Sequence, residues 1–343
     1  MEKVVIIGGG IGGLVTAKTL AKEGIPPLLF EKNKTFGQKA CGEMVTEEFF
    51  GLNLYQFLEK EEVILRKSEK MVINFAGRDY FFDLKNSSLG FKKVVQLDKR
   101  AFEEELAEEA KEFGAKIFLG KEVKKLERKK DSILIDDEIE AKLVIGADGF
   151  HSVCRKFVGQ KIKSYGFAIS GYGKSEREYP TFFFDPEISK EGCGWVFPRQ
   201  GGEANVGFGG LEAEKVKSSL EKFLSKFGLK IENEKGAFLP TQLPFRLSFD
   251  NLILVGEAGA LTDPFWGAGI ASAIFSGYLA GKMAKEAIEK NDFSAKFLRK
   301  YEKEVKEKIY LKSFRNLLLQ KIFSFLLPHK KTVNLLLKIL SRL

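Results

Sequence analysis

The stretch Val4-Val-Ile-Ile-Gly-Gly-Gly-Ile-Gly-Gly13 decides the fold of this 343-residue chain. Its four apolar residues are typical of a buried parallel strand, and its glycines fit the spacing Gly8-x-Gly10-x-x-Gly13 at the start of a helix. Gly8 allows a tight turn, Gly10 lets a pyrophosphate approach the backbone, and Gly13 lets the helix pack close to the strand. The free N–H groups at the helix N-terminus would then hold the phosphates.

A second strand strengthens this interpretation. The apolar run Pro27–Phe30 ends on Glu31, one strand–helix–strand unit after the glycines. A carboxylate at that place accepts hydrogen bonds from the hydroxyls of an adenosine ribose. The sequence therefore predicts a dinucleotide site at the N-terminus, and the alternative is a glycine-rich turn beside an incidental surface glutamate.

The composition is that of a soluble globular protein with room for two domains. Apolar residues make up 44% of the chain and charged residues 30%. The three cysteines form no Cys-x-x-Cys pair, and the two histidines, His151 and His329, suggest no metal site. Because we find neither a signal peptide nor an apolar run of about 20 residues, we expect a cytoplasmic protein without a membrane span. The many Lys and Glu residues are typical of thermophiles.

The pattern of apolar residues predicts the elements along the chain. Residues 45–70 read as helical and mixed, whereas alternation over 71–84 predicts strands. Asp98 is a candidate N-cap for a helix over 99–113. Further strands are predicted at 94–97, 116–119, 123–126, 133–135, 143–146 and 251–255. Residues 160–244 are predicted to form mainly strands, apart from a helix at 214–227, and another helix is predicted from 267–270 to about 288.

We expect an α/β fold, α+β overall, in which a Rossmann-type domain carries an inserted, mainly antiparallel β-sheet domain and a helical C-terminus. The predicted boundaries place residues 1–70, 92–158 and 246–290 in the nucleotide-binding domain, 71–91 and 159–245 in the substrate-binding sheet domain, and 291–343 in C-terminal helices.

Three later stretches are further candidates for nucleotide contacts. Arg100 lies in the first turn of a helix, where the helix dipole disfavours a cation unless an anion is near, although a solvated Arg is the common explanation. One strand runs into Gly146-Ala-Asp-Gly149. Another runs into Gly256-Glu-Ala-Gly, and the chain then reaches Gly267-Ala-Gly-Ile270 at the start of a helix of small residues.

This order of motifs resembles the flavoprotein superfamily of the aromatic hydroxylases over residues 1 to about 290, and within it the geranylgeranyl reductases, FAD enzymes that saturate prenyl double bonds. Two motifs carry the narrower match. One is Lys-Ala-Cys-Gly-Glu at 39–43, and the other is Trp-x-Phe-Pro at 195–198, followed after eight residues by Gly-x-Gly at 207–209. Glu257 replaces the superfamily's Asp, and Cys193 replaces the family's Tyr two residues before the Trp.

The resemblance implies roles for individual residues. Cys41 would supply or position the proton that a double bond needs after hydride transfer, although free cysteines are more often small buried hydrophobes. The helix start at Gly267–Ile270 would direct N–H groups at the anionic part of a reduced flavin, and tight packing is the alternative. The implied FAD-binding residues are Gly8, Gly10, Ile11, Gly12, Gly13, Glu31, Lys32, Cys41, Gly42, Met44, Arg100, Val123, Asp148, Gly149, Glu257, Asp263, Gly267, Gly269 and Ile270. The implied substrate-binding residues are Cys193, Trp195, Phe197, Pro198, Gly207 and Gly209, whose aromatic members would also fit an ordinary core.

The C-terminal region predicts basic amphipathic helices. From Lys312 onward the chain has seven Lys and Arg and no acidic residue, out of a net charge of +9. Such helices either lie on an anionic membrane or cover the flavin domain or a dimer interface. If they lie on a membrane, a chain ending near Glu307 would keep its FAD. The apolar positions are Leu311, Phe314, Leu318, Ile322, Phe325, Val333, Leu336, Leu337, Leu340 and Leu343, with a break at Pro328, and the basic ones are Lys312, Arg315, Lys321, Lys330, Lys331, Lys338 and Arg342.

We predict an FAD-dependent oxidoreductase that saturates carbon–carbon double bonds of a prenylated lipid or quinone, with peripheral binding at the cytoplasmic membrane face. An FAD monooxygenase or halogenase of the same fold, and a membrane-surface flavoprotein that passes electrons to quinone, stay open as alternatives. A nicotinamide dehydrogenase would leave the C-terminal flavin-type elements unexplained. Because we find no second complete nucleotide motif, either NAD(P)H or a ferredoxin could donate electrons. We expect no nucleic-acid partner, and the sequence leaves the oligomeric state open.

Overall fold

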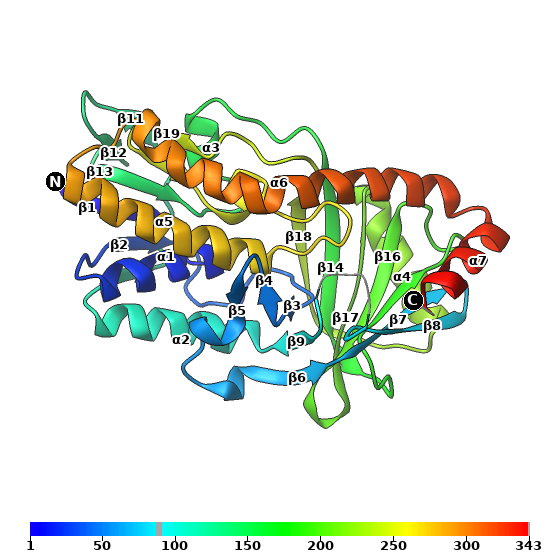
Figure 1. Ribbon diagram of the computed structural model, residues 1–343. Helices are drawn as coiled ribbons and strands as arrows, with labels where there is room; N and C mark the ends of the chain where they lie inside the picture. The colour runs from blue at the N-terminus through cyan, green and yellow to red at the C-terminus, as the bar shows by residue number, and fades with distance from the viewer. Residues whose placement is uncertain (87–90, 342–343) are drawn as a thin grey trace.

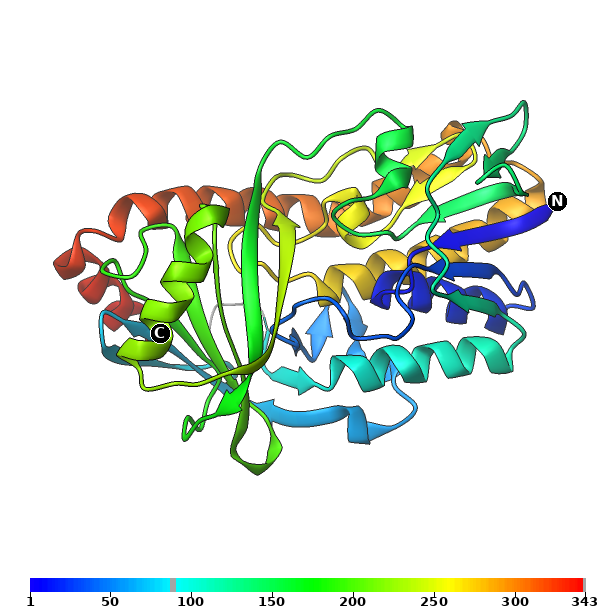
Figure 2. The same ribbon diagram turned by 180° about the vertical axis from the view of Figure 1, so that it is seen from behind.

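The computed structural model describes residues 1–86 and 91–341. An eight-stranded mixed sheet and a seven-stranded, mainly antiparallel sheet form the two ends of an elongated molecule, and the long helix α6 runs across both (Figure 1, Figure 2). The predicted α/β class, with a Rossmann-type part, an antiparallel sheet and a helical C-terminus, is confirmed. Arg342 and Leu343 of the predicted tail lie outside the described residues.

Parallel pairing brings the predicted nucleotide-contact stretches to one edge of the eight-stranded sheet. Ile7 at the end of β1 lies beside Phe30 of β2 and Gly146 of β13, and Gly146 lies beside Leu254 of β20. The loops that follow these strands therefore leave the sheet together, which is where ligands bind in such folds. The parallel strands are β1 (Glu2–Ile7), β2 (Leu28–Glu31), β10 (Lys116–Leu119), β13 (Ile139–Gly146) and β20 (Leu252–Leu254), and the antiparallel ones are β11 (Leu126–Arg128), β12 (Ile133–Ile135) and β19 (Ser248–Phe249).

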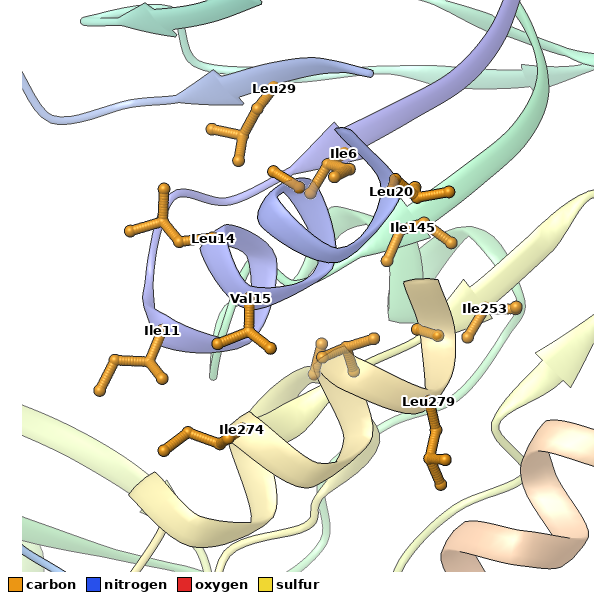
Figure 3. Packing of buried hydrophobic residues seen from close by; sticks show 14 of the residues in the cluster. Ile6, Ile11, Leu14, Val15, Leu20, Leu29, Ile145, Ile253, Ile274 and Leu279 are labelled. Atoms are coloured by element: carbon orange, nitrogen blue, oxygen red, sulfur yellow. The ribbon is translucent and has the colours of Figure 1, made fainter. Parts of the chain in front are cut away.

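Helix α1 packs against both α5 and α2, and Figure 3 shows its buried side chains between the sheet strands and α5. A Cβ atom on Gly13 would lie 2.0 Å from the carbonyl oxygen of Gly8, so only glycine lets the helix start so close to β1. The hydroxyl of Thr16 donates to the carbonyl oxygen of Gly277 at 3.0 Å and joins α1 to α5. The helices of this part are α1 (Ile11–Lys22), α2 (Lys99–Glu112), the short α3 (Val153–Phe157) and α5 (Ile270–Lys290), with a 3-10 turn η5 (Gly256–Gly259).

The seven-stranded sheet is covered on both faces. Phe182 and Phe184 of β15, like Trp195 and Phe197 of β16, point to one face, whereas Phe183 and Val196 point to the opposite face, against α4. This alternation is the period of two expected of a strand. The strands are β7 (Lys70–Phe75), β8 (Arg78–Asp83), β14 (Tyr165–Lys174), β15 (Thr181–Phe184), β16 (Gly192–Pro198), β17 (Glu203–Gly210) and β18 (Glu232–Pro240), with α4 (Val216–Lys226), η3 (Gln200–Gly202) and η4 (Ala213–Lys215).

Two predictions of secondary structure were wrong. Residues 45–70 form short strands and 3-10 turns rather than helices, because β3 and β6 pair with β9 and this tertiary pairing outweighs local propensity. The strand predicted at 123–126 starts only at Leu126, where pairing with Ile135 begins. The elements of this region are β3 (Met44–Thr46), β4 (Glu48–Phe49), β5 (Leu52–Asn53), η1 (Leu54–Phe57), η2 (Glu61–Val63), β6 (Ile64–Ser68) and β9 (Val94–Leu97).

The C-terminal helices α6 (Ala295–Leu326) and α7 (Lys330–Leu340) pack on the fold with one face. The hydroxyl of Tyr301 donates to the carbonyl oxygen of Leu254 at 2.8 Å and fixes the first half of α6 to the eight-stranded sheet. Leu327, Val333 and Leu337 are buried in the same cluster as the aromatic face of the seven-stranded sheet. The tail therefore covers both parts of the molecule, while its other face stays exposed.

Candidate functional site

One large cavity of about 460 Å³ lies between the two sheets. It begins at the N-terminus of α1 and extends past the loop at Cys41 to Phe323 and Leu327 of the C-terminal helices. It thus joins the predicted nucleotide site to the aromatic face of the seven-stranded sheet. The predicted site residues that line it are Gly10, Ile11, Gly12, Cys41, Gly42, Met44, Gly149, Cys193, Trp195, Phe197, Gly209, Glu257, Asp263, Gly267, Gly269 and Ile270.

The nucleotide end of the cavity has the polar groups that FAD needs. The N-termini of α1 and α5 both face it, and neither cap residue, Gly10 or Gly269, offers a side-chain hydrogen bond. Their first N–H groups are thus available to phosphates and to the anionic part of a flavin. One carboxylate oxygen of Glu257 accepts from Lys39 Nζ at 2.6 Å, while its Oε2 is buried without a partner among the described residues. That oxygen can accept a cofactor hydroxyl, so these residues fit FAD.

Other predicted FAD ligands lie beside the cavity rather than in its lining. Glu31 Oε2 accepts the backbone N–H of Gly9 at 2.7 Å, so its carboxylate sits at the glycine loop. Arg100 is exposed and pairs with Glu104 at 2.8 Å. Asp148 is half-buried shortly before α3, where it accepts the N–H of Cys154 at 3.1 Å, and burial of its carboxyl raises its pKa. Gly8, Gly13, Lys32, Val123, Pro198 and Gly207 also lie outside the lining that the described residues form.

The loop at Cys41 and the Trp-Phe-Pro strand interlock. A Cβ atom on Gly42 would lie 2.9 Å from the ring of Phe197, and one on Gly207 would lie 2.2 Å from the ring of Trp195. Asn205 joins the two segments, because its Nδ2 donates to the carbonyl oxygen of Cys41 at 2.8 Å and its Oδ1 accepts from Trp195 Nε1 at 2.9 Å. The two sequence motifs are therefore parts of one structural unit that holds Cys41 at the cavity.

Cys41 is set up to hold a proton. Burial raises the pKa of its thiol, and the ammonium of Lys99 opposes that shift only in part. At neutral pH the group is therefore a thiol rather than the reactive thiolate. Lys99 is itself buried and pairs with Glu103 at 2.6 Å. This chemistry suits a proton donor at the cavity wall better than a nucleophile.

The far end of the cavity is apolar, and sequence reasoning missed most of its wall. The ring centre of Phe182 lies 5.0 Å from that of Phe197 and 4.9 Å from that of Trp266. The ring centre of Phe184 lies 4.8 Å from that of Phe323 on α6. The alternation of Phe182 and Phe184, and the place of Trp266 inside a flavin-type loop, were usable signals. Nothing in the sequence pattern indicated that α6 would return to this wall.

The carboxylate of Asp263 positions a loop. Its Oδ1 accepts the backbone N–H groups of Phe265 and Trp266, each at 3.0 Å, and its Oδ2 accepts from Asn316 Nδ2 of α6 at 2.6 Å. Gln320 of α6 also donates to the carbonyl oxygen of Pro264 at 2.8 Å. Helix α6 therefore holds the loop whose glycines line the cavity at the start of α5.

Comparison with known proteins agrees with this geometry. The FAD binding domain profile matches residues 1–171, and the geranylgeranyl reductase catalytic domain profile matches residues 156–238. Digeranylgeranylglycerophospholipid reductase of Thermoplasma volcanium is 32% identical, over 91% of this chain and 85% of its own length. The crystal structure of a geranylgeranyl bacteriochlorophyll reductase-like protein from Thermoplasma acidophilum matches with a TM-score of 0.87 and 26% identity, over 99% of this chain and 91% of that one.

More distant structures share the fold alone. The p-nitrophenol 4-monooxygenase of Pseudomonas putida has a TM-score of 0.75 at 16% identity, over 99% of this chain and 98% of its own. The profile matches and the Thermoplasma relatives extend over both sheets, whereas this monooxygenase shares little sequence. The chain belongs to the geranylgeranyl reductase family and is an FAD-dependent oxidoreductase.

Proposed function

We propose that this protein saturates carbon–carbon double bonds in the prenyl chain of a lipid or quinone. The observation that carries this proposal is the cavity itself, which runs from the FAD-binding end past the thiol of Cys41 to an aromatic wall. An extended isoprenoid chain matches such an apolar channel, because burying each CH₂ group is worth about 0.8 kcal/mol. The printed names of the relatives, which are reductases of digeranylgeranyl lipids, support the same substrate class.

The residues of the chain have separable tasks in this reaction. FAD, when bound in its reduced form, would supply the hydride for one carbon of the double bond. Cys41 holds a proton at Sγ for the other carbon, and Asn205 fixes the backbone of Cys41 so that the thiol faces the cavity. Trp195 and Phe197 form the apolar wall that keeps water from the reacting bond. Either NAD(P)H or a ferredoxin would reduce the enzyme, and steady-state assays with each donor distinguish them.

Anaerobic turnover tests the proposal. Enzyme reduced with dithionite under nitrogen is expected to saturate double bonds of geranylgeranyl diphosphate, with mass shifts in steps of two hydrogens. Enzyme stripped of FAD is the control and should give no product. Hydroxylation that needs oxygen, with no saturated product under nitrogen, would assign the protein to the monooxygenases instead.

We further propose that the exposed face of α6 and α7 binds an anionic membrane. Leu311 and Phe325 are 75% and 74% exposed at the two ends of an apolar stripe on α6 that also contains Phe314, Leu318 and Ile322. In α7, the exposed apolar residues are Leu335, Leu336, Ile339 and Leu340. Such a large apolar stripe is unusual on a protein that does not dock on something. No helix among the described residues could cross a bilayer.

The positive charge of this surface favours an anionic partner. Arg315 and Lys321 flank the stripe on α6, Lys331 and Lys338 lie on α7, and no acidic residue follows Glu307. Lys312 lies over the Phe50 ring and Lys330 pairs with Glu187 at 2.7 Å, so these two cations are partly engaged with the rest of the fold. Each basic residue near an anionic surface contributes roughly 1 kcal/mol, and the apolar face adds burial in the interface. The occupant that fits is therefore the surface of an anionic bilayer, which also holds a prenylated lipid near α6 and the cavity.

Two substitutions test this surface. We expect the double variant Leu311→Glu/Phe325→Glu to bind phosphatidylglycerol vesicles more than about tenfold less tightly than wild type in cosedimentation, because it removes two apolar groups and adds two negative charges. High salt should weaken wild-type binding only in part, since it screens the charges alone. Phe113→Glu is the matched control, because Phe113 is 49% exposed at the end of α2, away from α6 and α7 (Figure 1). Equal binding by the double variant would exclude this surface.

A further inference from the structure

A second, small cavity adjoins the large one at Cys41. Its volume is about 10 Å³, enough for one water molecule. Cys41 and Glu43 line both cavities, and Tyr172 and Asn205 line the small one. The proposed function gives Cys41 a proton to donate but does not say how that proton is replaced. The small cavity offers a place for replacement.

Glu43 is an unusual residue at this position. It is 6% exposed, and its φ of +60° is the left-handed conformation that non-glycine residues rarely adopt. Its carboxyl accepts from the Tyr172 hydroxyl at 2.8 Å and from Asn205 Nδ2 at 3.3 Å, while its backbone N–H donates to Cys41 Sγ at 3.3 Å. A strained, buried glutamate two residues from the thiol points to a functional constraint.

The surroundings of Glu43 raise the pKa of its carboxyl above the ordinary value for glutamate. Burial raises its pKa, and the hydrogen bond from Tyr172 and the charge of Arg199 reverse that shift only in part. Tyr172 comes from β14 and Arg199 follows β16, and the Arg199 guanidinium lies 4.4 Å from the Tyr172 ring centre. Other titratable groups near Glu43 are Asp98 and Lys99, from the start of α2, and the thiol of Cys41. The ammonium groups of Lys39 and Lys235 belong to residues that line the small cavity with Glu43.

We propose that Glu43 returns a proton to Cys41 after each turnover through the small cavity that both side chains line. The S–H bond of Cys41 breaks as a C–H bond forms on the substrate, which leaves a thiolate. The carboxyl O–H bond of Glu43 then breaks as the S–H bond re-forms, with one water as carrier. As solvent delivers a proton to the hydroxyl oxygen of the partly exposed Tyr172, the Tyr172 hydroxyl proton passes to the Glu43 carboxylate in the same step, because burial and the Glu43 carboxylate raise the pKa of Tyr172 and disfavour a free phenolate. This rests on the proposed function, because it needs Cys41 to lose a proton each cycle.

Lys99 is a poorer candidate for this task. Burial acts to lower its pKa, but the Glu103 carboxylate and the charges at Cys41 and Glu43 raise the pKa overall. The ammonium therefore keeps its proton, and its ion pair with Glu103 at 2.6 Å holds it in place. Lys99 stabilises a thiolate once formed, whereas Glu43 is the group that can neutralise it.

The first test compares the rate of a single turnover with the steady-state rate. In Glu43→Gln, a single anaerobic turnover of geranylgeranyl diphosphate should proceed at close to the wild-type rate, because Cys41 starts with its own proton. Steady-state turnover should fall by roughly tenfold or more, the scale of a lost proton-transfer group. The wild-type steady-state rate should decline as pH rises through the pKa of Glu43, and the variant should lack this decline. Glu43→Asp should restore part of the rate.

The second test needs no substrate. Because the ionised Glu43 carboxylate raises the pKa of Cys41, Glu43→Gln should shift the pH profile of Cys41 alkylation by iodoacetamide to lower pH, as read by mass spectrometry of the Cys41 peptide. Glu105→Gln is the control, since Glu105 is a buried glutamate on α2 whose carboxylate accepts the N–H groups of Glu59 and Lys60 outside both cavities.

The outcomes distinguish this inference from the proposed function. Wild type that saturates the prenyl chain, together with a Glu43→Gln variant of equal steady-state rate and unchanged alkylation profile, would overturn the role of Glu43 alone. A wild type that gives no saturated product would overturn the proposed function, and the alkylation shift would still report whether Glu43 is coupled to Cys41.

Discussion

Replacing Cys41 with alanine is expected to slow saturation of a prenyl double bond by about 10²- to 10⁴-fold, the usual range for removing a general acid. The side chain holds the proton at the cavity wall, and burial keeps that proton on the thiol at neutral pH. FAD should remain bound. The backbone N–H groups at the N-termini of α1 and α5, which would hold it, are not changed by the substitution of a side chain at position 41. Single-turnover product formation and the flavin absorbance spectrum measure the two effects separately.

A matched variant controls for the loss of a thiol. Cys154→Ala removes a buried thiol at α3 that does not line the cavity, so it should reduce saturation little. Cys41→Ser keeps a weaker acid at the same place and should fall between wild type and Cys41→Ala. A Cys41→Ala enzyme with the wild-type single-turnover rate and bound FAD would return Cys41 to a structural role.

Ending the chain after Glu307 is expected to unfold much of the protein or release FAD. The buried side chains of Ile309, Leu327, Val333 and Leu337 would be lost, and burying each is worth about 1.5–3 kcal/mol. Together this approaches the total free energy of unfolding of a typical domain. The truncation also removes Asn316, so the Asp263 loop at the cavity loses its partner on α6. Thermal unfolding and FAD retention measure the effect.

A variant of the exposed face of α6 separates the loss of buried contacts from a change of the helix surface. Leu318→Ser/Ile322→Ser changes only exposed residues of α6 and should leave the melting temperature near that of wild type. The expectation from the sequence that a chain ending near Glu307 keeps its FAD conflicts with the packing described above. A truncated protein that stays folded and yellow would show that the α6 contacts contribute little.

Local chemistry explains which parts could be predicted from the sequence. The glycine loop and Glu31 form a short pattern whose chemistry is local, so its prediction needs no knowledge of distant contacts. The Cys41 and Trp195 motifs were identified by resemblance to a family, and the contact between them, such as that of Asn205 with Cys41, spans 164 residues of sequence. Residues 45–70 could not be predicted in the same way, because β3 and β6 exist only through pairing with β9.

Amphipathic patterns alone could not decide where the tail lies. The stripe at Leu311–Phe325 and the buried face of α6 are both apolar enough to suggest burial, and only the folded chain shows which of them is covered. For the same reason the motif placed the side chain of Asp263 near a cofactor but could not predict its hydrogen-bond partner. Its Oδ2 accepts from Asn316 of α6, which lies 53 residues away in the sequence.

The unbroken length of α6 limits how this enzyme can open. Its 32 residues include neither glycine nor proline, and at about 1.5 Å per residue they span about 48 Å. Sharp bends in helices arise mainly at those residues, so a hinge between the two sheets would have to break α6. The chain does break between α6 and α7, at Pro328 and His329. We therefore expect the two halves of the molecule to keep their relative orientation while a prenyl tail enters the cavity.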